Sequence, residues 1–237
     1  MPSDALKARE ITGWYGKLPS LGDFASRRMS PGFLEAWDDW LAGGLADWRA
    51  RQPESWLDAY LASPSWRFLL MPGALTGVLS AGAWAGVLMP SVDRVGRYFP
   101  LTLVRPLYPM PGSVPEAQAL LAWLEELDEL TVSALQDDWN VDQLETALHR
   151  QAPWPQAPIP PAEAGAAPDS LAEWLVQVAA EPLSAGRPGR ALWLAPDGAG
   201  GQVLRTTTGL PRGPAFSALL TDAAGAADSA DQSITPR

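Results

Sequence analysis

Two short clusters of Asp and Arg residues hold the side chains best suited to binding chemistry. They lie in "GDFASRR" and "SVDRVGR" and contribute six charged residues: Asp23, Arg27, Arg28, Asp93, Arg94 and Arg97. Arg presents a planar fork of donors that fits a carboxylate or a phosphate, and paired Asp and Arg side chains also fix loops. Because each cluster contains Gly and follows a Pro, we expect both to be loops. The pattern leaves open whether the charges pair with one another or contact a ligand or partner.

Motifs for common catalytic chemistry are missing from the sequence. The only histidine, His149, lies at the end of an amphipathic helical stretch, where the helix dipole favours a charged ring, so we interpret it as a solvated or capping residue. There is no G-x-S-x-G or H-E-x-x-H motif, and "GWYGKL" lacks the spacing of a phosphate-binding loop. With no cysteine, the chain has neither a thiol nucleophile nor a thiolate metal ligand. We therefore expect no enzymatic activity and no metal.

The negative charge of the chain is concentrated in its second half. The formal net charge is −10, and all of the excess acidity lies in residues 119–237. A chain with this balance is repelled by a phosphate backbone, so we expect no nucleic-acid partner, whereas a basic protein surface is a permissible one. The sequence leaves open whether the acidic helices at 116–150 present a solvated face or a docking surface.

The longest apolar stretch, residues 68–92, is long enough to cross a bilayer. Pro72 and Gly73 form a turn signal inside it, and Arg67 and Arg94 flank it without the asymmetry that orients a membrane span. We therefore interpret it as buried strands and short helices, and expect no membrane insertion. The N-terminal residues mix charges at close spacing and contain no apolar segment typical of a secretory signal.

Hydrophobic periodicity and turn signals predict the order of the helices and strands. Strands are expected at 11–17, 66–71, 84–89 and 98–104, and a hairpin is expected to pair 191–195 with 202–209. Helices are expected at 31–52 after an N-cap at Ser30, at 56–61, from 113 onward, at 140–150, from 170 onward and at 214–220. Capping boxes are expected at 113–116 and 170–173.

Strands near both ends of the chain, with helices between them, favour one α/β domain whose sheet is assembled from distant segments. We expect a single-domain layered sandwich, with a mixed, partly antiparallel sheet flanked by helices. The domain is expected to span residues 11–221 and to contain a Pro/Ala-rich loop at 151–169. Residues 1–10 are expected to be a flexible N-terminus and residues 222–237 a disordered tail.

Several longer strings resemble the TagF family, whose members are accessory proteins of bacterial type VI secretion systems. They are "GWYGKLPSLGDFASRR", "PSWRFLLMPG", "WAGVLMPSVDRVGRYFPLTL" and, later, "ALWLAPDG" and "GLPRGPAFSALL". The resemblance spans about residues 12–221, and "GVLMPSVDRVGRYFPLT" is its most specific string. Leu194 departs from the family, where a second tryptophan often follows Trp193, and the Pro/Ala-rich stretch is lineage-specific.

The resemblance implies a cytoplasmic α/β sandwich with no known catalytic activity and no cofactor. It also implies a post-translational negative regulator of type VI secretion that binds the forkhead-associated-domain scaffold protein of the system. Two alternatives stay open at this stage. One is a small-anion-binding module or enzyme that uses Arg28, Asp93, Arg94 and Arg97. The other is a structural subunit of the secretion apparatus.

Overall fold

The computed structural model describes residues 11–151, 170–180, 189–197 and 201–221 of the 237-residue chain. Its centre is a seven-stranded sheet in the order β2-β1-β5-β4-β3-β6-β7. The strands are β1 (Gly13–Gly16), β2 (Ala25–Arg27), β3 (Trp66–Leu70), β4 (Trp84–Met89), β5 (Leu101–Pro106), β6 (Arg190–Pro196) and β7 (Gln202–Thr208). The expected N-terminus at 1–10, the tail at 222–237 and nearly all of the loop at 151–169 lie outside the described residues.

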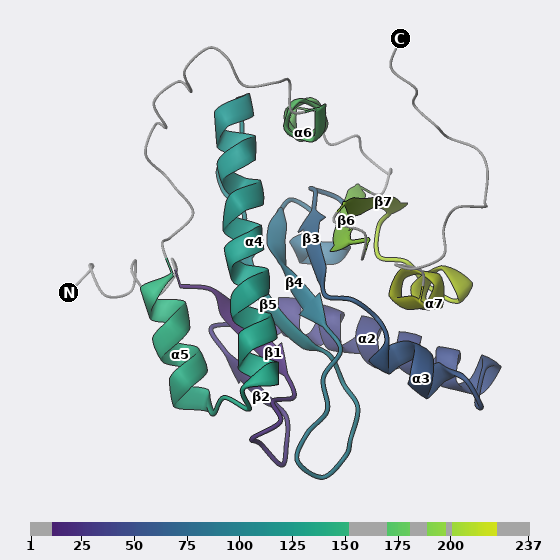
Figure 1. Cartoon of the computed structure of the whole chain (residues 1–237). Helices are drawn as coiled ribbons and strands as arrows, with labels where there is room; N and C mark the ends of the chain where they lie inside the picture. Colours follow the sequence, from purple (N-terminus) through teal and green to yellow (C-terminus); the bar gives the residue numbers. More distant parts are fainter. Residues whose placement is uncertain (1–10, 152–169, 181–188, 198–200, 222–237) are drawn as a thin grey trace.

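Helices cover both faces of the sheet (Figure 1). One face packs against α4 (Val114–Gln136), α5 (Val141–Arg150) and α6 (Ser170–Ala179). The other packs against α2 (Pro31–Arg51), α3 (Trp56–Leu61) and α7 (Pro214–Thr221), with the short 3-10 helix η1 (Gly77–Leu79) beside α2. The expected single layered α/β sandwich is thus confirmed.

The sheet is antiparallel throughout the described strands, without the parallel pairs that a mixed sheet would contain. Parallel neighbours need a long crossover, which is usually helical. Here the helical segments connect strands that are not neighbours, because α2 and α3 lead from β2 to β3, and α4 to α6 lead from β5 to β6. Strands that follow one another in the chain and are also neighbours in the sheet, such as β4 and β5, are joined without a crossover α-helix, so they run in opposite directions.

Alternation along each strand divides the apolar side chains between two cores. Trp14, Leu69 and Leu103 face the layer of α4, α5 and α6, whereas Tyr15, Phe68 and Val104 face the layer of α2. Among the described residues, six tryptophans are fully buried: Trp14, Trp37, Trp40, Trp48, Trp66 and Trp193. Buried indoles usually find a hydrogen-bond acceptor, as when Trp37 Nε1 donates to Thr102 Oγ1 at 2.9 Å and Trp40 Nε1 to the Pro211 carbonyl at 2.7 Å.

Most of the expected elements are confirmed, including α3, β4 and the β6–β7 hairpin, and the Ser30 side chain caps α2 by accepting from Phe33 N. The expected capping box at 113–116 is wrong, because the Ser113 side chain makes no cap hydrogen bond and Glu116 instead accepts from Gly112 N at 2.7 Å. The helix expected from 170 onward is confirmed as α6, whereas the side chain of Ser170, on which the capping box expected at 170–173 depends, lies outside the described residues.

Two local features were not anticipated from the sequence. A complete capping box opens α5, where the side chains of Asn140 and Gln143 each bond the backbone N–H of the other residue. The strand β2 lies inside the first charged cluster, which we expected to be a loop only. Three residues are too few to show a strand period, so β2 has no sequence signal of its own.

Candidate functional site

The loop between β4 and β5, residues 90–100, carries three of the six charged residues singled out above and projects beyond the sheet (Figure 1). Its two arms are joined by a bridge between Val92 and Tyr98 and by a hydrogen bond from Asp93 N to the Arg97 carbonyl at 3.0 Å. Gly96 has a φ of 80°, a left-handed conformation that glycine adopts without steric cost. The loop is therefore a closed turn with a defined tip.

Asp93 holds this turn from inside. Its Oδ2 accepts from Lys17 Nζ at 2.7 Å and from Arg97 Nε at 2.7 Å, while its Oδ1 accepts from the backbone N–H groups of Val95 and Arg97 at 3.0 and 2.9 Å. Lys17 and Asp93 are both buried. Burial acts to raise the pKa of Asp93, but the bonds from Lys17 and Arg97 outweigh it and keep the pKa below its usual range. Asp93 is a structural carboxylate that stays ionised.

A second anchor reaches the base of the loop from α3. The Tyr60 hydroxyl donates to the Ser91 carbonyl at 3.0 Å and accepts from Ser91 N at 2.9 Å. The Ser91 hydroxyl in turn donates to the Lys17 carbonyl at 2.7 Å. Burial raises the pKa of Tyr60, so the phenol remains protonated and able to donate. The loop is fixed at its base as well as at its turn.

The loop between β1 and β2, residues 17–24, packs beside the β4–β5 loop. Arg94 N donates to the Leu21 carbonyl at 3.1 Å, and Arg97 Nη2 donates to the Gly22 carbonyl. The carboxylate of Asp23 lies 3.9 Å from Arg97 and is almost fully exposed, so this ion pair contributes little. The structure thus brings Asp23, Asp93 and Arg97 together, as members of one pair of loops.

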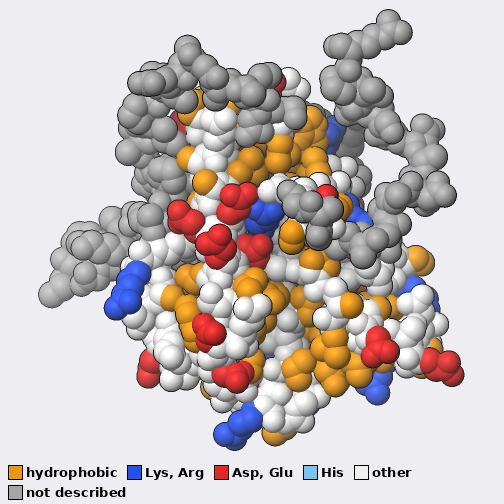
Figure 2. Space-filling view, in the orientation of Figure 1, with side chains coloured by type: hydrophobic (Ala, Val, Ile, Leu, Met, Phe, Trp, Pro, Cys, Tyr) orange, Lys and Arg blue, Asp and Glu red, His pale blue; other side chains and the backbone are white. Residues whose placement is uncertain are grey.

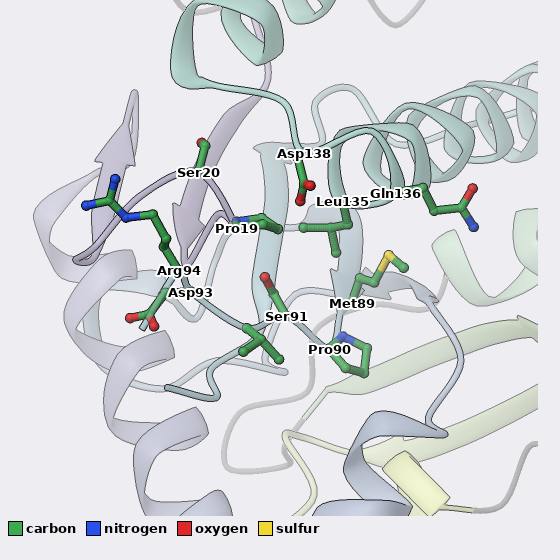
Figure 3. Close-up of a pocket in the computed structure, with 11 residues that line it drawn as sticks. Pro19, Ser20, Met89, Pro90, Ser91, Asp93, Arg94, Leu135, Gln136 and Asp138 are labelled. Carbon is green, nitrogen blue, oxygen red and sulfur yellow. The ribbon is translucent and has the colours of Figure 1, made fainter. Parts of the chain in front are cut away.

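Arg94 differs from the other charged residues of this site. Its side chain is exposed and has no hydrogen bond or ion pair within the described part of the chain. It lies on one rim of a groove of about 680 Å³ whose apolar lining includes Met89, Val92 and Leu135, with Asp138 on the helical side (Figure 3). Arg94 is therefore a charged side chain of this site that is available to a binding partner.

Arg28 lies in a second ion cluster, against α5. Its Nη1 and Nη2 donate to the two carboxylate oxygens of Glu145 at 2.6 and 3.0 Å, and its Nε and Nη2 also bond the Thr12 carbonyl. Trp14 Nε1 donates to the same Glu145 carboxylate at 2.6 Å. Burial acts to raise the pKa of Glu145, but the donors from Arg28 and Trp14 outweigh it and lower the pKa. Arg27 is exposed and, among the residues that the structure describes, bonds only the Ser26 carbonyl next to it.

The acidic helix α4 presents its carboxylates to a basic residue of the sheet as well as to solvent. Glu125 accepts from Arg67 Nη1 at 2.9 Å, and Asp128 accepts from the Ser65 hydroxyl. Burial raises the pKa of Asp128, and its neighbours Glu129 and Glu125 act in the same direction. Figure 2 shows acidic side chains gathered around a basic one in the middle of this face. The two carboxylates of α4 next to β3, those of Glu125 and Asp128, are accordingly structural.

Sequence reasoning missed Lys17, Tyr60 and Glu145, the partners that hold the two ion clusters. Lys17 had a weak signal, since a lysine within an apolar strand needs a counter-ion when it is buried. Glu145 had none, because it lies 117 residues from Arg28 and looks like one more acid on an acidic helix. Within the described residues, no group of three or more His, Cys, Asp or Glu side chains is arranged to hold a metal, and no helix is long and apolar enough to span a membrane.

We call the loops at residues 17–24 and 90–100 the paired-loop site. The fold and this site define an α/β sandwich whose charged side chains mainly fix its own loops. Comparison with known proteins then places the chain in a family: residues 13–151 match the model of the TagF N-terminal domain, described as type VI secretion system-associated. The chain belongs to the TagF family, and it is therefore a type VI secretion-associated protein. All of the residues of both ion clusters except Thr12 lie within the matched segment.

The chain is also similar to a solved structure over nearly its whole length. The crystal structure of PA0076 from Pseudomonas aeruginosa PAO1 is 32% identical in sequence and superimposes with a TM-score of 0.67, covering 94% of this chain and 100% of that one. No curated protein matches this chain.

Proposed function

We propose that this protein is a non-enzymatic, cytoplasmic, post-translational negative regulator of type VI secretion, and that it acts by binding the forkhead-associated-domain scaffold protein of the system. The observation that carries the proposal is the match to the TagF N-terminal domain over residues 13–151, which contains the whole paired-loop site. The chemistry of the site agrees with a binding role. Asp93, Arg97 and Arg28 are engaged in holding loops, and Arg94 is exposed for contact.

The small-anion alternative receives less support from this geometry. It requires several Arg side chains converging on one ligand, but Arg28 forms a bidentate pair with Glu145 and Arg97 bonds Asp93. Of the arginines in this alternative, Arg94 is the one without a side-chain partner in the described part of the chain, and it binds a small anion only weakly in water because solvent screens an exposed pair. A broad protein surface is the better match for one exposed Arg on a fixed loop.

Secretion by the native bacterium tests the regulatory role. Deleting the gene is expected to raise the amount of type VI tube protein released into the medium, and overproducing the protein is expected to lower it. The matched control is overproduction of a chain with Tyr60→Phe and Asp93→Asn, which lose anchors of the loop. Lower release after deletion would contradict the proposal and favour a structural subunit, which would also be present in the assembled apparatus at a fixed ratio.

The scaffold is tested separately, by affinity capture of the tagged protein at two salt concentrations with mass spectrometry of the co-purifying proteins. Recovery of the forkhead-associated scaffold, with a lower yield at higher salt, is the expected result for an electrostatic interface. If deletion raises secretion while the scaffold is absent from both captures, regulation stands and the named partner is wrong.

A further inference from the structure

The tip of the β4–β5 loop is exposed, although hydrogen bonds to Asp93 hold its backbone in place. Val95 is 64% exposed and Arg94 has no side-chain partner in the described residues. Between them and the core, the Asp93 carboxylate accepts four hydrogen bonds, two of which come from backbone N–H groups of the turn itself. A surface held in one conformation loses little entropy on binding, which is the physical advantage of preorganisation.

The β1–β2 loop extends this exposed area. Phe24 is 45% exposed, and its ring lies 4.9 Å from that of Phe99 in an edge-to-face arrangement. The Lys17 ammonium lies 4.1 Å from the centre of the Phe24 ring. Phe24 is thus held beside the base of the β4–β5 loop by the same lysine that bonds Asp93. We call Phe24, Arg94, Val95 and Arg97 the tip surface.

The tip surface is locally cationic on an acidic chain. Lys17 and Arg97 both pair with the single charge of Asp93, which leaves an excess positive charge, and the unpaired Arg94 adds to it. Asp23 offsets part of this charge from a position 3.9 Å from Arg97. The whole chain carries a formal charge of −10. A local field that opposes the overall charge favours one orientation of approach toward a negatively charged surface.

From these observations we infer that the tip surface docks on a protein face that presents carboxylates around an apolar recess. Val95 and Phe24 supply the apolar contact, and Arg94 and the exposed part of Arg97 pair with the carboxylates. Arg and aromatic residues are enriched in such interfaces. Asp138, across the groove from Arg94, repels acidic groups and directs them to the tip rather than into the groove. This inference rests on the proposed function and identifies the surface that contacts the scaffold.

Binding of purified full-length protein to the purified forkhead-associated scaffold tests the inference by calorimetry at low and at physiological salt. Arg94→Glu is expected to weaken the affinity about tenfold or more at low salt, and less at higher salt. Its thermal unfolding is expected to be unchanged, because the Arg94 side chain has no partner in the part of the chain that the structure describes. Val95→Ser is expected to weaken binding at both salt concentrations. The control is Arg212→Glu, the same change at an exposed arginine ahead of α7.

Each other outcome overturns a specific statement. If the unaltered protein does not bind the scaffold, the proposed partner and this inference both fail. If it binds, and Arg94→Glu and Val95→Ser bind equally well, the scaffold stands and the tip surface is wrong. Equal losses for Arg94→Glu and Arg212→Glu would reveal a general charge effect and also overturn the surface. Loss of binding after phosphatase treatment of the scaffold would identify phosphate, not carboxylate, as the recognised group.

Discussion

Arg28 combines an unfavourable backbone conformation with an extensive set of side-chain bonds. Its φ is 55°, in the left-handed region where a Cβ crowds the following carbonyl. In return, its guanidinium joins three segments that are distant in sequence, because it bonds Glu145 of α5 and the Thr12 carbonyl ahead of β1. Backbone strain of this kind persists only when surrounding contacts hold it. The bonds of Arg28 therefore stabilise β2 against α5.

Two substitutions separate the two effects at Arg28. Arg28→Ala is expected to lower the free energy of unfolding by about 1–3 kcal/mol, because it removes the bidentate pair and keeps the strained backbone. Arg28→Gly loses the same pair but relieves the strain, so it is expected to be about 1 kcal/mol more stable than Arg28→Ala. Urea unfolding followed by tryptophan fluorescence measures both. An Ala variant at least as stable as the Gly variant would show that the left-handed conformation is not retained.

The helices α2 and α7 approach each other closely at a glycine of α2, Gly44. A Cβ built on Gly44 would lie 2.5 Å from atoms of the Phe216 ring, which is fully buried and also contacts Trp40. The adjacent Gly43 has open space at the same position. Two neighbouring glycines of one helix therefore have different roles, since one permits close approach and the other only lowers helix propensity.

Alanine at each position tests this packing. Gly44→Ala is expected to destabilise the protein by about 1–3 kcal/mol, because the buried ring has to shift and repacking outweighs the gain in helix propensity. Gly43→Ala, its matched control, is expected to stabilise the protein by about 0.5–1 kcal/mol. Thermal unfolding of both variants gives the signs. Similar stabilisation by both would mean that α7 does not approach α2 at Gly44.

What the sequence predicts depends on how local the determining interaction is. The helices α2 and α4 repeat their apolar residues over several turns, so periodicity predicts them. The strands β3 and β4 are short apolar runs, and the turn signals that bound them predict them. The strand β2 exists because Trp14 pairs with Arg27 and Tyr15 with Ser26, which no local pattern encodes. The expectation of parallel pairs failed for the same reason, since strand order is set by long-range packing.

The residues of the candidate site likewise fall into those that a local pattern predicts and those that only the fold brings together. The charged loop at Asp93, Arg94 and Arg97 was visible as a local cluster, whereas its counter-ion Lys17 lies 76 residues from Asp93. Pairing across that distance depends on β1, β5 and β4 lying next to one another in the sheet. Residue types therefore revealed which charges needed partners, and only the fold revealed which partners they had.

For the whole molecule, pH changes two opposing contributions to the stability of the fold. The chain has a formal charge of −10 at pH 7, so its acidic side chains repel one another. This repulsion falls as the pH approaches the isoelectric point near 4.5. The paired carboxylates act in the opposite direction. The folded-state pKa of Asp93 and that of Glu145 are both below their ordinary values. Such a group stabilises the fold above its unfolded pKa, and this stabilisation is lost as the pH falls toward the folded pKa.

Glu145→Gln isolates one of these carboxylates, because glutamine keeps the shape and removes the charge that pairs with Arg28. The unaltered protein is expected to be more stable than Glu145→Gln near pH 7, and the difference should shrink as the pH falls below the ordinary glutamate value of 4.5. Glu126→Gln, at an exposed glutamate of α4, is the control and should show a small difference at every pH. Urea unfolding from pH 7 to about pH 3 measures both series. If the unaltered protein and Glu145→Gln differ in stability by the same amount at every pH, the ionised carboxylate is not what joins α5 to Arg28. The link between α5 and the strand pair β1–β2 would then rest on packing alone.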